Sequence, residues 1–296
     1  MQLILGRGSF VAKNLIGDIK ISRENCDLTN YDQLLKVLQH FKPSLVINCA
    51  AAHGSAQFMS QNHSYFLEQN IIMDSNVLKA SHSLGIENVV LLSSVSAFPN
   101  IENRDLVEGD LYKGQVNNYN QGYNASKRIS HDLCTAYQLD YSRNYKVLFL
   151  GNLYGRYGKF AKDANVLNSI IYQMYQAKLN KEDLTLYGDG LDSRAFTFVE
   201  DLNKIIVPFV GNKLTNSAIF SSSEVISIKQ LAELIAMKMK FNGEIIFNGQ
   251  RTLGQRRKVA SSNYLKHEIK GLTFTTLDVG LDIAINWYIN SLTTAN

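Results

Sequence analysis

The chain has 296 residues, of which 45% are hydrophobic and 19% charged, and its formal net charge is +4. This length suits one large domain or two closely packed ones. The positive charge is mild and scattered, so nucleic-acid binding is not indicated. No apolar run approaches the roughly 20 residues of a membrane span, and Cys26, Cys49 and Cys134 lack metal-binding or disulfide spacing. We therefore expect a cytoplasmic protein with free thiols, without a signal peptide, metal, or membrane partner.

The first segment predicts a strand, a glycine-rich turn and a helix, in that order. Residues 3–5 are apolar and suit a buried strand. An amphipathic helix follows the turn and is closed by Gly17. Glycines let the backbone approach a pyrophosphate, whose charge lies at the helix N-terminus, so this order is typical of a dinucleotide-binding turn. The turn residues that we expect to contact the cofactor are Gly6, Arg7, Gly8, Ser9, Phe10 and Val11.

The end of the second predicted strand, at residues 19–22, bears on the choice of cofactor. A carboxylate is usual there when a ribose 2′-hydroxyl is bound. Here the residues are Ser22 and Arg23, and Arg7 lies in the glycine turn. Two guanidinium groups suit a 2′-phosphate, which favours NADPH over NADH; the alternative is that Arg23 is a surface arginine. Asp27 follows, at the place of an adenine-contacting aspartate.

The first half of the chain alternates strands with helices. The expected strands are 3–5, 19–22, 44–49, 88–92 and 146–150, and the expected helices are 31–40, 65–84 and 122–139. This alternation predicts an α/β fold with a Rossmann-like, doubly wound parallel sheet. After Gly155 the pattern changes, with helices expected from 166, at 227–240 and at 277–292 and a strand at 194–199. We expect a cofactor domain at 1–152 and about 195–225, and a smaller α/β substrate-binding lobe at about 153–194 and 226–296.

Tyr123 and Lys127 lie four residues apart in the helix expected at 122–139. That spacing puts both side chains on one helix face. A lysine ammonium beside a phenol lowers the tyrosine pKa. The phenol can then give or take a proton while a hydride moves at the neighbouring carbon. The same spacing also occurs on solvated helix faces, so its meaning depends on the other motifs.

Taken together, the motifs resemble the extended short-chain dehydrogenase/reductase family over nearly the whole chain. Within it, they are most similar to the GDP-fucose synthase group of nucleotide-sugar 4-keto reductases. Each motif is weak alone, but their order is that of the family. The matching segments are 46–51 (VINCAA), 69–76 (QNIIMDSN), 93–99 (SSVSAFP), 152–155 (NLYG), 188–190 (GDG) with 194–196 (RAF), and 251–258 (RTLGQRRK).

The resemblance implies roles for individual residues. Ser94 would hydrogen-bond the substrate carbonyl, Tyr123 would protonate it, and Lys127 would hold the nicotinamide ribose. The family also forms homodimers through the helices that correspond to 65–84 and 122–139. Further implied cofactor contacts are Ala50, Ala51 and Asn70, and implied substrate contacts are Asn152, Arg194, Arg251 and a member of Arg256, Arg257 and Lys258.

Two motif positions distinguish reactions within the family. Dehydratases carry an Asp-Glu pair where this chain has Val95 and Ser96, so dehydration is not expected. The cysteine and histidine that epimerise C3 and C5 correspond to Ser96 and Asn165, which do not titrate near pH 7 and would at most hydrogen-bond substrate hydroxyls. His53 is the one other histidine that could reach the pocket.

These features predict an NADPH-dependent reductase of a nucleotide-linked 4-keto-6-deoxy sugar, without C3/C5 epimerase activity, in deoxysugar and polysaccharide biosynthesis. GDP is the favoured nucleotide, and CDP and dTDP stay open. The alternatives are a 4-epimerase with retained NAD, a reductase of a non-nucleotide carbonyl, and a non-catalytic NADP(H)-binding protein of the same fold.

Overall fold

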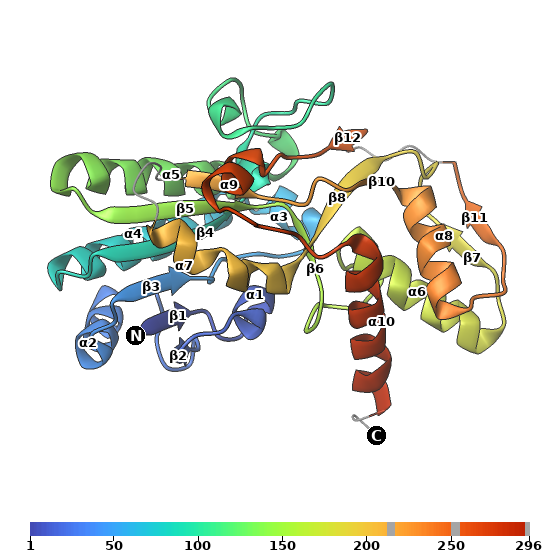
Figure 1. Ribbon diagram of the computed structural model, residues 1–296, viewed down its shortest axis with the longest axis horizontal. Helices are drawn as coiled ribbons and strands as arrows, with labels where there is room; N and C mark the ends of the chain where they lie inside the picture. Colours follow the sequence, from blue (N-terminus) through green and yellow to red (C-terminus); the bar gives the residue numbers. More distant parts are fainter. Residues whose placement is uncertain (212–216, 250–254, 294–296) are drawn as a thin grey trace.

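A six-stranded parallel sheet forms the larger part of the computed structural model, which describes residues 1–211, 217–249 and 255–293. The strand order is β2-β1-β3-β4-β5-β9 (Figure 1). The predicted parallel, Rossmann-like sheet is therefore confirmed, and the five strands expected in the first half are present. The bounds are β1 Gln2–Leu5, β2 Ile19–Ile21, β3 Leu45–Asn48, β4 Asn88–Ser94, β5 Asn144–Leu150 and β9 Ser217–Phe220.

Helices cover both faces of this sheet because alternate strand residues point to opposite sides. Leu3 and Leu5 pack in one apolar cluster with side chains of α2, α4 and α5. Ile4 packs in a second cluster with side chains of α1, α7 and α9. Figure 1 shows α4 and α5 side by side along the sheet. The bounds are α1 Phe10–Asn14, α2 Tyr31–Phe41, α4 His63–Ser83, α5 Gln121–Tyr141, α7 Ile206–Gly211 and α9 Asn263–Glu268.

A second group of elements has its own apolar core beyond the sheet. Three helices, α6, α8 and α10, share this core with β7 and β8. The predicted helices and the strand at 194–199 are confirmed, whereas the strands of two to three residues were not predicted. The bounds are β6 Asn152–Tyr154, α6 Val166–Asn180, β7 Leu184–Leu186, β8 Ser193–Phe198, β10 Val225–Ser227, α8 Ile228–Met239, β11 Ile245–Phe247, β12 Arg257–Lys258 and α10 Leu277–Thr293.

The two groups are joined at the carboxyl end of the six-stranded sheet. β6 begins two residues after β5 ends and pairs with β8, which in turn pairs with β10 and β12. The chain also reverses direction across the sheet between β1 and β3, since β2 and β3 flank β1 on opposite sides. Ligands of open α/β sheets bind at such a switch point, beyond the strand ends.

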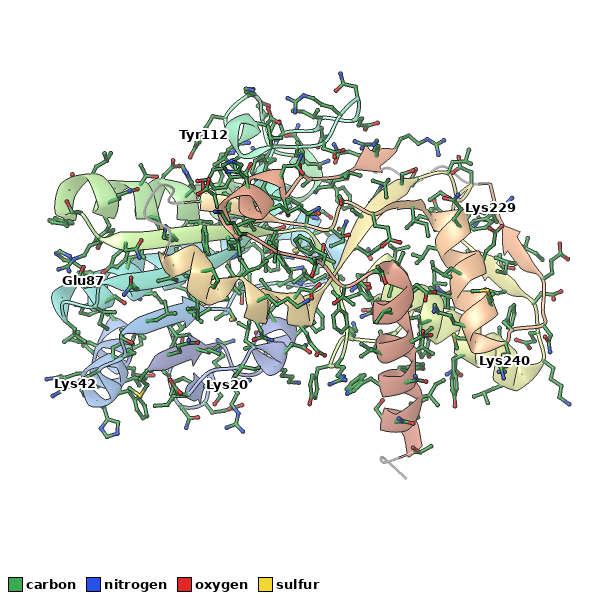
Figure 2. The ribbon with its side chains drawn as sticks, viewed as in Figure 1. Lys20, Lys42, Glu87, Tyr112, Lys229 and Lys240 are labelled. Atoms are coloured by element: carbon green, nitrogen blue, oxygen red, sulfur yellow. The ribbon has the colours of Figure 1, made fainter. Side chains whose placement is uncertain are left out.

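Charged groups lie over the outside of both groups. Figure 2 labels Lys42 and Glu87 near one end of the large sheet, and Lys229 and Lys240 at the two ends of α8. All four are exposed. Within the described ranges, no helix combines the length and the apolar character needed to cross a membrane.

Candidate active site

The glycine turn after β1 approaches the end of β3 closely. Gly6 has a φ of +84°, and a Cβ placed there would lie 2.8 Å from the Ala50 backbone nitrogen. A side chain is therefore excluded by both backbone conformation and space. Ser9 caps α1, its Oγ accepting a hydrogen bond from the Ala12 N–H at 3.2 Å. The N–H groups of the first helical turn, at Phe10 and Val11, have no partner within the helix and are available to an anion.

A cleft extends from this turn along the ends of β1, β2 and β3. Its shape and chemistry suit a dinucleotide, since backbone N–H groups lie at one end and small side chains along one wall. The residues that line it include Gly6, Gly8, Ser9, Ser22, Arg23, Asp27, Leu28, Ala50, Ala51, Ala52 and Met73.

The expected 2′-phosphate site lies at the β2 end of this cleft. The Arg23 side chain is 83% exposed, and its guanidinium is 4.0 Å from the Asp27 carboxylate. Asp27 also accepts two hydrogen bonds from Thr29, which lower the pKa of its carboxyl group. Arg7 differs from expectation: its side chain is exposed but does not line the cleft, and its N–H donates to the Ile21 carbonyl at 2.9 Å. Arg23 is thus the better placed of the two arginines.

Asn70 was expected to contact the cofactor, and in the structure its side-chain amide bonds to the protein backbone. It is buried in α4, where its Oδ1 accepts from the Ala52 N–H at 2.8 Å. Its Nδ2 donates to the carbonyls of Ala52 and Phe66. These hydrogen bonds fasten α4 to the loop after β3 at Ala52.

Ser94, Tyr123 and Lys127 come from the end of β4 and the start of α5. Ser94 is the last residue of β4, and its Oγ accepts from the Ser96 N–H at 3.2 Å. The Lys127 Nζ lies 5.6 Å from the centre of the Tyr123 ring, so both share one helix face as predicted. The Ser93 Oγ donates to the Lys127 carbonyl at 2.7 Å and fixes the helix against β4.

The net pKa of Tyr123 is raised in this structure, whereas the spacing from Lys127 predicted that it would be lowered. Burial is the main cause that raises the pKa of Tyr123 to about 12, and the negative charge of Asp74 adds to it. Burial also lowers the pKa of Lys127, while Asp74 opposes that change. A phenol in this state holds its proton at neutral pH and can donate it, which suits reduction of a carbonyl.

Sequence reasoning missed Asp74 and left His53 as an open possibility. The His53 ring packs edge-to-face on Tyr123, with ring centres 5.4 Å apart. Burial and the nearby Lys127 charge lower the pKa of His53. Asp74 is four residues after Asn70 on α4, and both are buried. A pair of polar residues at that spacing on an otherwise apolar helix face is the sequence pattern that could have indicated it.

The expected substrate-binding side of the site contains cations from β8 and β12. Lys258 lies beside Arg194 in the strand register, and both are half-buried. Burial, aided by the Arg194 charge, lowers the pKa of Lys258 to about 8. Arg256 pairs with Asp189 and Asp192, and Arg257 pairs with Asp105.

Among the described residues, Lys258 has no carboxylate partner, whereas Arg194 has Asp192 at 3.5 Å. Lys258 is therefore the member of this basic segment that is most available to an anion. Arg251, also expected to bind substrate, lies outside the described residues.

Three polar residues complete the predicted substrate contacts. Asn152 begins β6, and its Nδ2 donates to the Ala195 carbonyl at 3.0 Å. The Ser96 Oγ is buried without a hydrogen-bond partner among the described residues, so a ligand group could satisfy it. Asn165 caps α6, its Oδ1 accepting from the Asn168 N–H at 3.0 Å. Asn165 is thus the N-cap of α6, the role that an asparagine directly before a helix commonly has.

Within residues 1–211, 217–249 and 255–293, no group of three or more His, Cys, Asp or Glu side chains is arranged to hold a metal ion. The three cysteines are free thiols, and Cys26 and Cys134 are buried.

The doubly wound sheet and its glycine turn define the class, a Rossmann-like dinucleotide-binding protein. Residues 5–220 match the NAD dependent epimerase/dehydratase family, and the chain belongs to this family.

The chain is similar to known proteins and to solved structures over nearly its full length. GDP-L-fucose synthase of Dictyostelium discoideum is 29% identical over 275 residues, covering 92% of this chain and 86% of that protein. The NADP-bound GDP-L-fucose synthetase of Naegleria fowleri has a TM-score of 0.88 at 20% identity, covering 99% of this chain and 95% of its own. The NADP-bound GDP-mannoheptose C4 reductase of Campylobacter jejuni has a TM-score of 0.85 at 20% identity, covering 97% and 98%.

Proposed function

We propose that this protein is an NADPH-dependent reductase of a nucleotide-linked 4-keto-6-deoxy sugar, with GDP as the favoured nucleotide and without C3/C5 epimerase activity. The observation that carries the proposal is the position of the Tyr123 and Lys127 pair on α5. This helix is fastened to the end of β4 by the hydrogen bond from Ser93, next to Ser94, and His53 of the loop after β3 packs on Tyr123. The names of the relatives support a GDP-linked sugar as substrate and NADPH as cofactor.

In the proposed reaction each side chain acts on the substrate C4 oxygen or its surroundings. Bound NADPH supplies the hydride. Ser94 donates a hydrogen bond to the C4 oxygen and stabilises the negative charge that develops there. Tyr123 transfers its phenolic proton to that oxygen. Lys127 holds its positive charge beneath the Tyr123 ring and stabilises the phenolate that remains.

The nucleotide would be bound by the second group of elements. Lys258 and Arg194 are proposed to contact the diphosphate, since they offer adjacent positive charge at a half-buried site. A second cleft is lined by Val166, Tyr187, Gly188, Gly190 and Arg194, among others. Because Arg194 lines this cleft and is also proposed to contact the diphosphate, the cleft could hold the nucleoside that is attached to that diphosphate.

We also propose the division of the chain that the sequence predicted. Residues 1–152 and about 195–225 would bind NADPH, and about 153–194 with 226–296 would bind substrate. The separate apolar core of α6, α8 and α10 supports this division. The free thiols suit the proposed cytoplasmic location.

A homodimer through α4 and α5 is proposed as the working assembly. These two helices pack side by side and expose apolar side chains that a second copy could cover. The exposed residues are Ile72 on α4 and Leu139 and Tyr141 on α5.

The proposed lack of C3/C5 epimerisation rests on two substitutions in the motifs. Ser96 and Asn165 hold the positions where the family's epimerising enzymes carry cysteine and histidine, and neither side chain exchanges protons with carbon at neutral pH. His53 contacts Tyr123 and is therefore the remaining side chain that could exchange protons with C3 or C5.

The experiment that tests the proposed reduction uses NADPH carrying deuterium at nicotinamide C4. Incubation with a GDP-linked 4-keto-6-deoxy sugar should place deuterium at sugar C4, detected by mass spectrometry and NMR, with one NADPH oxidised per product. The same sugar linked to CDP and dTDP tests the nucleotide. Protein that purifies with tightly bound NAD and leaves added NADPH unused would contradict the proposal and favour a 4-epimerase.

A further inference from the structure

We propose that Asp74 is a positioning residue for the reaction inferred above: its carboxylate fastens α5 to the cofactor loop and supplies the negative charge opposite the buried Lys127. The inference rests on the proposed function. Asp74 touches neither the cleft nor the substrate residues, so it would act through Lys127 and Tyr123.

Two hydrogen bonds connect Asp74 to the elements on either side of α4. Its Oδ1 accepts from the Asn48 Nδ2 at 2.8 Å, at the end of β3. Its Oδ2 accepts from the Ser130 Oγ at 2.6 Å, on α5. Ser130 lies three residues after Lys127, on the same helix face. Asp74 therefore joins the strand that leads into the cofactor loop to the helix that carries the catalytic pair.

The orientation of Asn48 is set independently of Asp74. Its Oδ1 accepts from the Ala50 N–H at 3.0 Å, so its Nδ2 faces the carboxylate. Both Asp74 oxygens therefore lie within hydrogen-bond distance of a donor. Burial raises the pKa of the Asp74 carboxyl group, and the Lys127 charge and the hydrogen bonds from Ser130 and Asn48 oppose that rise. The same chain of bonds reaches Ala50, whose backbone lies against the glycine turn at Gly6.

Lys127 is the cation whose charge acts on Asp74, although the two side chains do not form a direct ion pair in the described part of the chain. Asp74 and Lys127 are 4% and 2% exposed, so neither charge is well solvated. The titratable groups that interact electrostatically with Asp74 come from α5: Lys127, Tyr123 and Cys134. Asn48 of β3 contributes a hydrogen bond only, and His53 of the following loop interacts with Lys127.

Removing the Asp74 charge should lower two pKa values at once. Asp74 raises the pKa of Lys127 against the effect of burial, and it raises the pKa of Tyr123. Reduction needs a protonated phenol and an ammonium group beside it. Without Asp74 both groups would lose their protons at lower pH, so the alkaline limb of the pH–rate profile should move to lower pH.

A stability cycle tests the charge pairing without substrate or cofactor. The variants are Asp74→Asn, Lys127→Met and the double variant, and the melting temperature of each is measured at neutral pH. Lys127→Met should lower the melting temperature, because it leaves a buried carboxylate unpaired, and adding Asp74→Asn should recover much of that loss. If the decrease in melting temperature of the double variant equals the sum of the decreases in the two single variants, the two side chains do not interact, and the proposed charge interaction would be overturned. If Asp74→Asn alone does not fold, the melting temperatures of Lys127→Met and of the double variant are compared instead. A higher melting temperature for the double variant supports the charge interaction, and an equal or lower one overturns it.

The pH profile then tests the positioning role. Asn keeps the shape of Asp and can still accept the hydrogen bond from Asn48. For Asp74→Asn we expect the alkaline limb of the kcat–pH profile to move about one unit to lower pH. At a fixed pH on that limb, kcat would then be about tenfold lower than in the wild type. Asp201→Asn, at a buried carboxylate outside the site, is the matched control and should keep the wild-type limb. An unshifted limb in folded Asp74→Asn would overturn the proposal. If the wild type reduces no nucleotide-linked 4-keto sugar, the proposed function fails, while the stability cycle still decides the pairing.

Discussion

Replacing Tyr123 by phenylalanine isolates the proton that the proposed reaction requires. The change removes one hydroxyl and keeps the ring that packs on His53 at 5.4 Å and over Lys127 at 5.6 Å. Among the described residues that hydroxyl has no hydrogen-bond partner, so its loss strands no buried donor or acceptor. We expect the free energy of unfolding to change by less than about 1 kcal/mol.

The expected effect on turnover is much larger. With a pKa of about 12, Tyr123 is fully protonated at neutral pH, so every wild-type molecule carries the donor. General acid catalysis contributes roughly 100- to 10,000-fold, equivalent to about 2.7–5.4 kcal/mol of activation free energy. The reverse oxidation needs the phenolate, so its rate should still be rising at pH 10.

The assay is NADPH consumption under saturating GDP-linked 4-keto sugar, with NADPH affinity measured by fluorescence titration. Tyr119→Phe, at a tyrosine that is 48% exposed and four residues earlier, is the matched control and should retain wild-type turnover. Retained turnover in Tyr123→Phe, with NADPH affinity unchanged, would refute the assignment of Tyr123 as the proton donor.

Three further predictions follow from the cofactor turn and from α4 and α5. Arg23→Asp should shift the kcat/KM ratio toward NADH by about 10- to 100-fold, because it removes a charge-assisted hydrogen bond and adds an anion; equal use of both cofactors by the wild type would contradict the role of Arg23. Gly122→Ala should lower the free energy of unfolding by about 1–3 kcal/mol, because a Cβ there would lie 2.0 Å from the His63 carbonyl oxygen. Gly109→Ala, where the space is open, is its control in denaturant titrations. Light scattering at micromolar concentration should give about twice the 33.3 kDa chain mass, and a monomer mass would remove the proposed dimer.

Local rules were enough to predict most of the large sheet and the long helices. The apolar runs at β1, β3, β4 and β5 are short and continuous, as expected for strands buried on both faces. The glycine turn was also predictable, because the requirement at Gly6 arises from backbone conformation near a strand end. The strands β6, β7, β10, β11 and β12 were not predicted, since segments of two or three residues carry no periodicity of their own.

The chemistry of the site depended on contacts that sequence order does not reveal. The pKa of Tyr123 follows from its burial and from Asp74 on another helix, so the local spacing of Tyr123 and Lys127 gave the wrong direction. The basic run near the end of the chain offered several equivalent cations. Asp189 and Asp192 hold Arg256, and Asp105 holds Arg257, and those carboxylates lie far away in sequence.

Reduction of a GDP-linked 4-keto-6-deoxy sugar by NADPH in deuterium oxide tests both the reductase activity and the lack of epimerisation in one reaction. The product should be reduced at C4 and should carry no deuterium on C3 or C5, because Ser96 and Asn165 cannot exchange protons with those carbons. Deuterium at C3 or C5, appearing faster than in a control without enzyme, would show that epimerisation survives and would contradict the account.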